Sequence, residues 1–222
     1  MIKAVVFDLD NTVYDYDWCH NRAMNNLKEY ACQKYKLCEF EFYEAFDKAR
    51  KEVKEILGDT GASHNRMLYM QLFLENIKEK PTKGALELYN IYWDSMLSDM
   101  ELFEYVITVL KDLQNRGITI GVLTDLTAQI QHRKIRKLNL IDFVDVLVTS
   151  EEAGVEKPSR IAFERIMNKL QCEADEVLMI GDSQEKDVDG AIQSGMHGLL
   201  FEKKNASDMD KRIMEFINDK MV

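Results

Sequence analysis

The sequence predicts an α/β fold, in which a parallel sheet is flanked by helices and interrupted by four inserted helices. After residue 98, short apolar segments rich in branched side chains alternate with amphipathic helical segments. One further strand, at residues 2–7, is separated from these by a long stretch that is helical throughout. The chain has 222 residues and 46% hydrophobic content, enough for one sizeable core and a small insert. We therefore expect residues 1–15 and 98–222 to form a sheet domain and residues 16–97 to form an inserted helical domain.

Each element is predicted from its local pattern. The first strand is a nearly continuous apolar run, which is typical of a strand buried on both faces. In the insert, aromatic and aliphatic residues recur at helical spacing in four stripes, which we interpret as core rather than as cofactor contacts. The expected later helices cover residues 103–116, 127–137, 159–170, 187–194 and 207–218, and the expected later strands cover residues 118–123, 144–148, 177–180 and 198–201. This alternation is typical of a Rossmann-like parallel sheet.

Charge and composition restrict the partners. The formal net charge is −10, so a nucleic acid is not expected as a partner. The basic run His132–Lys137 has no interleaved aromatic residues, and we interpret it as the solvated face and the charged C-terminal end of one helix. No segment approaches the roughly 18–20 apolar residues of a membrane span, and no signal peptide or membrane partner is expected. The oligomeric state is not predicted.

The four cysteines indicate a compartment. They form neither a C-x-x-C pair nor a spacing typical of zinc ligands. We interpret them as reduced thiols, which predicts a cytoplasmic protein.

Polar side chains follow four of the expected strands at their carboxyl ends, where ligands bind in parallel α/β sheets. Each signal alone is also typical of an ordinary turn, helix cap or solvated loop, but their joint occurrence at one edge predicts a site. Acidic residues that end a buried strand are costly unless something neutralises them. The simplest account of the first pair is a hard metal ion, with one carboxylate available as a nucleophile. The residues are Asp8 and Asp10 after the first strand, Thr124 after the second, Lys157 after the third, and Asp182 with Asp187 after the fourth.

In these motifs the chain resembles the haloacid dehalogenase-like hydrolase superfamily. The resemblance covers the whole α/β part, and the inserted helices resemble the mobile cap of the helical-cap branch. The motif set is specific for the superfamily and much less specific for the substrate. The matching segments are Asp8-Leu9-Asp10-Asn11-Thr12, Thr124, Lys157-Pro158 and Gly181-Asp182-Ser183-Gln184-Glu185-Lys186-Asp187.

The resemblance implies a role for each residue, and the chemistry of phosphoryl transfer supports these roles. Asp8 is expected to be the nucleophile that becomes an aspartyl-phosphate. Asp10 is expected to be the general acid, which protonates the leaving alcohol and later deprotonates water. The Thr124 hydroxyl and the backbone of Asn11 are expected to bind phosphate oxygens, while Lys157 offsets negative charge.

The same acidic residues imply a Mg²⁺ cofactor. The expected ligands are the carboxylates of Asp8 and Asp182 and the carbonyl oxygen of Asp10. Asp187 is expected to be a direct ligand or a partner of the ligands. Carboxylates this close to one another repel strongly, so a cation is needed among them.

The presence of Asp10 favours a phosphatase acting on a small phosphorylated metabolite, because dehalogenases of this superfamily lack the second acid. Several alternatives remain open, namely a phosphomutase, a haloacid dehalogenase and a phospho-accepting protein that is not an enzyme. Nucleotides, sugar phosphates and glycolate phosphate all remain possible substrates.

Three further residues are candidates for substrate or phosphate contact. Asp125 departs from the family pattern, in which Asn often follows the motif threonine. Its negative charge would lie near the phosphate pocket, and we favour the alternative that it caps the following helix. In the insert, His64 and Arg66 are candidates for contact with the leaving group, against the alternative of a solvated loop followed by helix-surface charges.

Overall fold

The computed structural model describes residues 1–220, which form two compact units. The α/β unit consists of Met1–Asp15 and the chain from Glu101 onward, and the helical unit consists of Tyr16–Met100. The expected domain boundary after residue 97 therefore lies within the last turn of the final helix of the helical unit.

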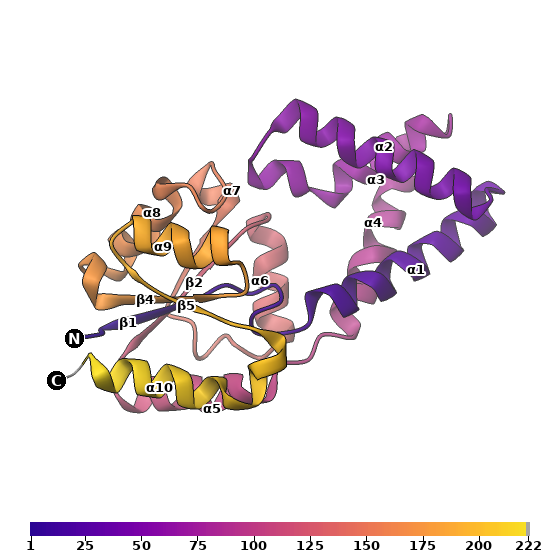
Figure 1. The fold of residues 1–222 in the computed structure, drawn as a ribbon. Coiled ribbons are helices and arrows are strands. Elements are labelled where there is room, and N and C mark those ends of the chain that lie inside the picture. The colour runs from indigo at the N-terminus through magenta and orange to yellow at the C-terminus, as the bar shows by residue number, and fades with distance from the viewer. Residues whose placement is uncertain (221–222) are drawn as a thin grey trace. The chain divides into compact units, whose positions relative to one another are not determined.

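A five-stranded parallel sheet forms the centre of the described α/β unit, as the sequence predicts (Figure 1). The strand order is β3-β2-β1-β4-β5, so the first strand lies in the middle of the sheet. Its four residues are completely buried, which explains why an apolar run without alternation forms this strand. The strands are β1 (Ala4–Phe7), β2 (Thr119–Thr124), β3 (Val146–Thr149), β4 (Val177–Gly181) and β5 (His197–Leu200).

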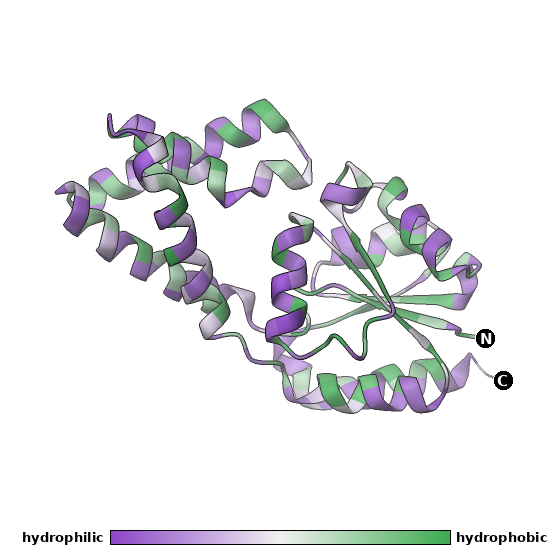
Figure 2. Ribbon diagram, turned by 180° about the vertical axis from the view of Figure 1, so that it is seen from behind, coloured by the Kyte–Doolittle hydropathy of each residue, from purple (hydrophilic) through white to green (hydrophobic). Residues whose placement is uncertain are grey.

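Helices cover both faces of the sheet (Figure 1). Helices α5 and α10 pack together on one face, and α8 and α9 lie on the other. The longer helices α5, α8 and α10 each bury an apolar stripe. Figure 2 shows hydrophobic and hydrophilic residues alternating along these helices. The helices are α5 (Glu104–Asn115), α6 (Ala128–Lys137), α7 (Ser150–Ala153), α8 (Arg160–Leu170), α9 (Gly190–Gln193) and α10 (Met209–Asp219).

Alternate side chains of the strands fill the two cores. Ala4 and Val6 of β1 pack with Phe163 and Ile166 of α8 in one buried cluster. The side chain of Val5 points to the opposite face because successive residues of a strand alternate. Both faces of the sheet are therefore dry, and the polar groups that follow the strands gather at the carboxyl edge.

The helical unit contains four long helices and one short 3₁₀ turn in its described residues. Helix α1 packs on α4, α4 on α3, and α3 on α2. Aromatic rings fill the contact between α2 and α3, where the Phe42 and Phe73 ring centroids lie 5.3 Å apart. The elements are α1 (Tyr16–Tyr35), α2 (Glu39–Leu57), the 3₁₀ turn Gly61–His64, α3 (Arg66–Asn76) and α4 (Pro81–Ser98).

Two local features of the α/β unit differ from the expectation. The helix expected over residues 187–194 begins earlier, as a π-helix over Gln184–Asp189, and α9 continues it. The short helix α7 follows β3 directly and was not expected. Two 3₁₀ turns, Ala174–Glu176 and Lys203–Asp208, complete the unit. Among residues 1–220, no helix combines the length and the apolar character needed to cross a membrane.

Candidate active site

The register of the sheet brings three of the motif segments to one edge. Phe7 pairs with Val122 of β2 and with Ile180 of β4. The next residue, Asp8, donates its backbone N–H to the Ile180 carbonyl oxygen at 2.9 Å. Thr124 and Asp182 lie two positions beyond the same pairs, so both lie at this edge. The sheet thus positions groups that are more than a hundred residues apart in sequence.

Lys157 forms the electrostatic centre of the site. Its ammonium donates to Asp8 Oδ1 at 2.7 Å, to Asp187 Oδ1 at 2.5 Å and to the Leu123 carbonyl oxygen at 3.2 Å. The side chain is 4% exposed. Three acceptors around one buried ammonium satisfy all its donors, which makes the burial of this charge tolerable.

The pKa values of the site follow from burial and from these charges. Burial and the neighbouring Asp187 raise the pKa of Asp8, against the opposing effect of the Lys157 ammonium. Burial alone would lower the pKa of Lys157, but the carboxylates of Asp187 and Asp8 outweigh it and raise that pKa. Partial burial and Asp187 raise the pKa of Asp182 to about 6. Negative charge is thus in excess here, and another cation would be bound favourably.

The π-helix after β4 sets the position of Asp187. The Asp187 carboxylate accepts the backbone N–H of Ser183 through Oδ2 at 3.0 Å, while its other oxygen accepts from Lys157. Gly181 allows this arrangement, because a Cβ atom there would collide with the Asp187 carboxylate. A π-helix at such a position is typical of functional sites.

Three carboxylates are close enough to hold one metal ion. Oxygen atoms of Asp8, Asp182 and Asp187 all lie within 4.8 Å of one another. Oxygen donors of this kind suit a hard divalent cation such as Mg²⁺, and the raised pKa values of Asp8 and Asp182 fit a site that gains from added positive charge. The carboxylate of Asp10 is not part of this group, so the metal role predicted for Asp10 rests on its carbonyl oxygen.

The Asp10 carboxylate is held from the other side by two groups that the sequence analysis did not identify as site residues. Lys134 of α6 donates its ammonium to Asp10 Oδ1 at 2.6 Å and to Oδ2 at 2.8 Å. The Tyr14 hydroxyl donates to Asp10 Oδ1 at 2.6 Å. The side chain of Lys134 is completely buried, so the interpretation of the run His132–Lys137 as a solvated face is wrong at this residue.

A signal for this exception was present in the sequence. Position 134 falls on the apolar stripe of α6, between Ile130, Ile135 and Leu138, which are all buried. A lysine on the buried face of an amphipathic helix needs a carboxylate partner. The polar residue Gln131 lies on the same stripe and is also completely buried.

Gln131 binds the predicted phosphate-binding loop. Its amide Nε2 donates to Thr124 Oγ1 at 2.8 Å and to the Asp125 carbonyl oxygen at 2.5 Å. Thr124 is 1% exposed and ends β2. The predicted phosphate-binding hydroxyl is therefore supported from behind by α6.

Asp125 does not cap the following helix, as the sequence analysis favoured. Its Oδ1 accepts the backbone N–H of Lys157 at 3.2 Å, and its Oδ2 accepts from the Lys186 ammonium at 3.2 Å. The first turn of α6 is instead bound by Glu151, whose carboxylate accepts from Ala128 N–H at 2.7 Å. Asp125 thus connects the loops that follow β2, β3 and β4, and its charge is paired with Lys186.

The remaining candidates lie in two places. Asn11 follows Asp10 directly and has a left-handed backbone with φ of 61°. In the helical unit, His64 ends the 3₁₀ turn and Arg66 begins α3. Arg66 is not a surface charge, because it is 8% exposed and donates to the Tyr16 hydroxyl and to the His64 carbonyl oxygen, each at 2.8 Å. Contact of His64 and Arg66 with a substrate stays a prediction.

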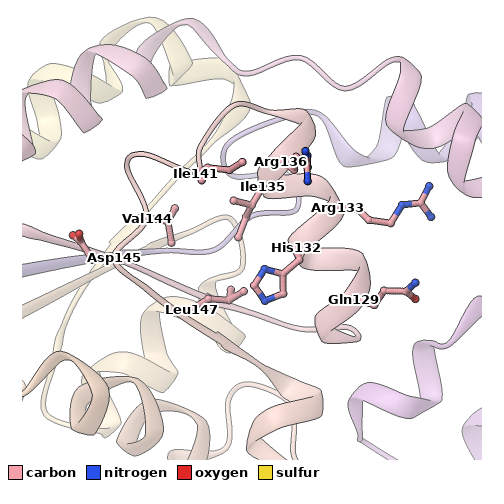
Figure 3. A pocket seen from close by; sticks show the side chains of 9 residues that line it. All are labelled: Gln129, His132, Arg133, Ile135, Arg136, Ile141, Val144, Asp145 and Leu147. Carbon is pink, nitrogen blue, oxygen red and sulfur yellow. The ribbon is translucent and has the colours of Figure 1, made fainter.

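A groove of about 700 Å³ lies on the outer side of α6, against edge strand β3 (Figure 3). Gln129, His132 and Arg136 line it from the helix, and Leu147 lines it from the strand. None of the acidic residues of the site borders this groove. Helix α6 therefore has two different faces, one exposed to the groove and one turned to Asp10 and Thr124.

The fold and the site together define an α/β enzyme in which a buried carboxylate lies beside a lysine, a hydroxyl and an acidic cluster. A family model described as haloacid dehalogenase-like hydrolase matches residues 2–195, and the chain belongs to this family.

Relatives agree with this assignment, and a solved structure has the same fold. The chain is 39% identical over 210 residues to a ribulose-1,5-bisphosphate 5-phosphatase of Halopiger xanaduensis, covering 94% of this chain and 88% of the relative. It is 29% identical to a glyceraldehyde 3-phosphate phosphatase of Methanopyrus kandleri, covering 96% and 89%. A 2-haloacid dehalogenase structure from Pseudomonas syringae shares the fold, with a TM-score of 0.74, 22% identity and coverage of 90% and 86%. The chain is thus a hydrolase of the phosphatase type.

Proposed function

We propose that the protein is a Mg²⁺-dependent phosphatase that removes the phosphate group from a primary carbon of a small sugar. The reaction would proceed through an aspartyl-phosphate on Asp8. The observation that carries this proposal is the buried Asp8 carboxylate, held 2.7 Å from the Lys157 ammonium within a cluster of three carboxylates. Such an arrangement offers a fixed nucleophile and positive charge at the same point, which phosphoryl transfer requires.

The reaction has two steps. In the first, a carboxylate oxygen of Asp8 forms a bond to phosphorus, the bond from phosphorus to the ester oxygen breaks, and Asp10 gives its proton to the departing alkoxide. In the second, Asp10 takes a proton from water, whose oxygen attacks the phosphorus. The bond between phosphorus and Asp8 then breaks, which regenerates the Asp8 carboxylate and the protonated Asp10 and releases inorganic phosphate.

The other residues bind the phosphate group. The Thr124 hydroxyl and the backbone N–H of Asn11 donate to its oxygens, and Lys157 offsets its charge. Asp8, Asp182 and the carbonyl oxygen of Asp10 would hold Mg²⁺, with Asp187 as a further ligand or as a support. The ion, when bound, supplies neutralisation of the charge on the phosphate oxygens.

The substrate class is inferred from the named relatives. Both named substrates, ribulose 1,5-bisphosphate at its 5-position and glyceraldehyde 3-phosphate, carry the phosphate on a terminal CH₂ group of a short sugar. The leaving group of such an ester is a primary alkoxide, which is poor unless it is protonated. Asp10 suits this need, because it is a second carboxyl group two residues from the nucleophile.

We also propose that the helical unit acts as a cap that selects the leaving group, with His64 and Arg66 as contacts. The support for this is the position of the insert between the first and second motifs. Arg66 already has internal partners, so its contribution to binding would come from the donors that Tyr16 and the His64 carbonyl leave unused.

The test is a phosphate-release assay with ribulose 1,5-bisphosphate, glyceraldehyde 3-phosphate and an aryl phosphate. We expect activity with Mg²⁺ and its loss on chelation, with recovery when Mg²⁺ is returned. The Asp8→Asn variant, which keeps the shape of the side chain, is expected to have no activity, and wild-type protein quenched in acid should carry phosphate on Asp8. Full activity in Asp8→Asn, or unchanged activity after chelation, would contradict the proposal.

A further inference from the structure

We infer that the buried polar face of α6, formed by Gln131 and Lys134, positions the reacting groups of the site. Gln131 fixes the Thr124 hydroxyl as a hydrogen-bond donor, and Lys134 fixes the carboxylate of Asp10. This inference rests on the proposed phosphatase function and assigns two positioning residues to it. The residues are one helical turn apart, so both side chains leave the same face of α6.

The orientation of the Gln131 amide follows from its neighbours. The Asp125 carbonyl oxygen, 2.5 Å from the amide, can only accept a hydrogen bond, so the atom facing it must be the nitrogen. The same nitrogen lies 2.8 Å from Thr124 Oγ1 and donates its second hydrogen there. Rotating the amide by half a turn would place two oxygens against each other and is therefore excluded.

This arrangement determines which way the Thr124 hydroxyl points. An Oγ atom that accepts from Gln131 must direct its own hydrogen elsewhere. The Asp125 carbonyl oxygen lies 3.4 Å away, a long distance for an O–H donor, and already accepts from Gln131. The hydrogen is thus available to an incoming acceptor, and the oxygens of a phosphate ester act as acceptors.

A second observation supports a functional rather than a purely structural role for Gln131. Its Oε1 atom is buried and has no hydrogen-bond partner among the described residues. A residue selected only for stability would be apolar at this position, or would have both amide atoms paired. The unpaired oxygen indicates that the donor side of the amide is what the site needs.

Lys134 performs the corresponding task for Asp10. Its ammonium contacts both carboxylate oxygens, and the Tyr14 hydroxyl contacts Oδ1. The Lys134 side chain is fully buried, whereas that of Asp10 is 23% exposed. The carboxylate is therefore held from the protein side and open on the other, the position required of a group that exchanges a proton with a leaving alcohol and with water. Helix α6 links this group rigidly to Thr124.

The experiment for Gln131 uses substitutions of similar shape. In Gln131→Glu, the side chain no longer donates and competes for the Thr124 hydrogen. Hydrolysis of an aryl phosphate should lose about a hundredfold in kcat/KM, the scale for losing one oriented donor. Gln131→Met, which leaves the hydroxyl free to rotate, should lose less than Gln131→Glu. In a Thr124→Val background, Gln131→Glu should have almost no further effect, because no hydroxyl remains to be oriented. The control is Gln129→Glu, the same change on the exposed face of α6 (Figure 3).

The experiment for Lys134 uses two leaving groups. An alkyl phosphate needs protonation by Asp10, while a nitrophenyl phosphate needs it much less. Lys134→Met should therefore reduce kcat for the alkyl ester about tenfold more than for the nitrophenyl ester, within the range of general acid catalysis. Arg136→Met, on the groove side of the same helix, is the control (Figure 3). Circular dichroism of each variant verifies that it is folded.

The outcomes separate this inference from the proposed function. Wild-type protein that releases no phosphate refutes both. Active wild-type protein, with Gln131→Glu as active as wild type or equally impaired with and without the Thr124 hydroxyl, refutes the role of Gln131. Equal losses for the two leaving groups in Lys134→Met refute the role of Lys134.

Discussion

The two units of the protein bury positive charge in different ways. In the α/β unit, the ammonium groups of Lys157 and Lys134 lie against carboxylates at distances of 2.5–2.8 Å. In the helical unit, the buried guanidinium of Arg66 meets a tyrosine hydroxyl, a backbone carbonyl and the faces of Tyr69, Tyr92 and Trp93. The first arrangement pairs charge with charge, and the second spreads one charge over neutral partners.

This difference indicates what each cation is for. A carboxylate that accepts hydrogen bonds from a lysine still has further lone pairs for a metal ion, a phosphorus atom or a proton. Hydroxyls and aromatic rings around an arginine offer no such chemistry, but they fix the guanidinium plane and fill space. We therefore expect substitution of Lys157 to impair both catalysis and stability, with part of the stability recovered by Mg²⁺, and substitution of Arg66 to reduce stability without such recovery.

The largest effect is expected for Lys157→Met. Removing this ammonium leaves Asp8 and Asp187 buried without their shared partner, which destabilises proteins by about 3–5 kcal/mol. Hydrolysis should fall by at least about a hundredfold. Mg²⁺ should recover part of the lost stability, because a cation among the carboxylates replaces part of the missing charge. Thermal unfolding with and without Mg²⁺, together with phosphate release, measures these effects. A variant as stable as wild type without Mg²⁺ would contradict the comparison.

Arg66→Met is expected to act on the helical unit. The variant loses two hydrogen bonds from a charged donor and three contacts with aromatic rings. The free energy of unfolding should fall by about 2–4 kcal/mol. The two tryptophans of the chain, Trp18 and Trp93, both belong to this unit, so their fluorescence in a urea titration reports on it. In contrast to Lys157→Met, added Mg²⁺ should recover none of the loss, and recovery by Mg²⁺ would argue against the distinction drawn here.

A pH dependence should separate the units further. His20 forms a hydrogen bond with the Tyr92 hydroxyl, 2.7 Å from its Nδ1 atom. Burial and the nearby charges of Arg66 and Arg50 lower the pKa of His20 to about 4. The unfolded chain takes up this proton near pH 6.5, before the folded chain does. Stability is therefore complete above about pH 7 and falls as the pH decreases from 6.5 towards 4, by up to about 3 kcal/mol.

The measurement is the tryptophan-detected unfolding of wild type and His20→Gln at pH 7 and pH 5. Wild type should lose more stability than the variant over this interval, because glutamine does not titrate. Parallel losses in the two proteins would assign the pH dependence to other groups.

The sequence predicted the structure best where a local pattern has few alternative interpretations. A buried strand ending in two acids, a Gly-Asp pair after a later strand, and helical and apolar periodicities predicted the parallel sheet and its flanking helices. The acidic residues Asp8, Asp182 and Asp187 lie at one edge because parallel strands in register must end together. This part of the site follows from the parallel order of the strands, which the alternation of apolar strands and amphipathic helices in the sequence predicts.

The contributions of α6 were missed for a physical reason. Lysine at position 134 occurs in a run of basic residues, and such runs are usually solvated. Its burial is set by a tertiary contact with Asp10, 124 positions away in sequence. Asp125 was misassigned in the same way, because a local cap is visible in sequence, whereas its partners Lys157 and Lys186 are brought to it only by the fold.

The smallest predicted effect concerns Asp125 and its ion pair with Lys186. This pair joins two charges, as in the other lysines of the site, but it is partly exposed to solvent. The Lys186 side chain is 43% exposed and that of Asp125 is 20% exposed, so the pair should contribute less than about 1 kcal/mol to stability. Its effect should appear in substrate binding instead. Lys186→Met leaves the negative charge of Asp125 uncompensated near the phosphate pocket and should raise KM about threefold to fivefold, which corresponds to the same free energy.

Asp125→Asn supplies the decisive control. The amide keeps an oxygen that can accept the Lys157 backbone N–H but carries no charge to be compensated. In this background Lys186→Met should leave KM almost unchanged, whereas kcat should vary little in all four proteins, because neither group touches the reacting carboxylates. If Lys186→Met raises KM equally with Asp and with Asn at position 125, the pair with Asp125 is not the cause. The effect would then come from another partner of the lysine, either the substrate or the buried Glu156, whose Oε2 lies 3.6 Å from the Lys186 ammonium.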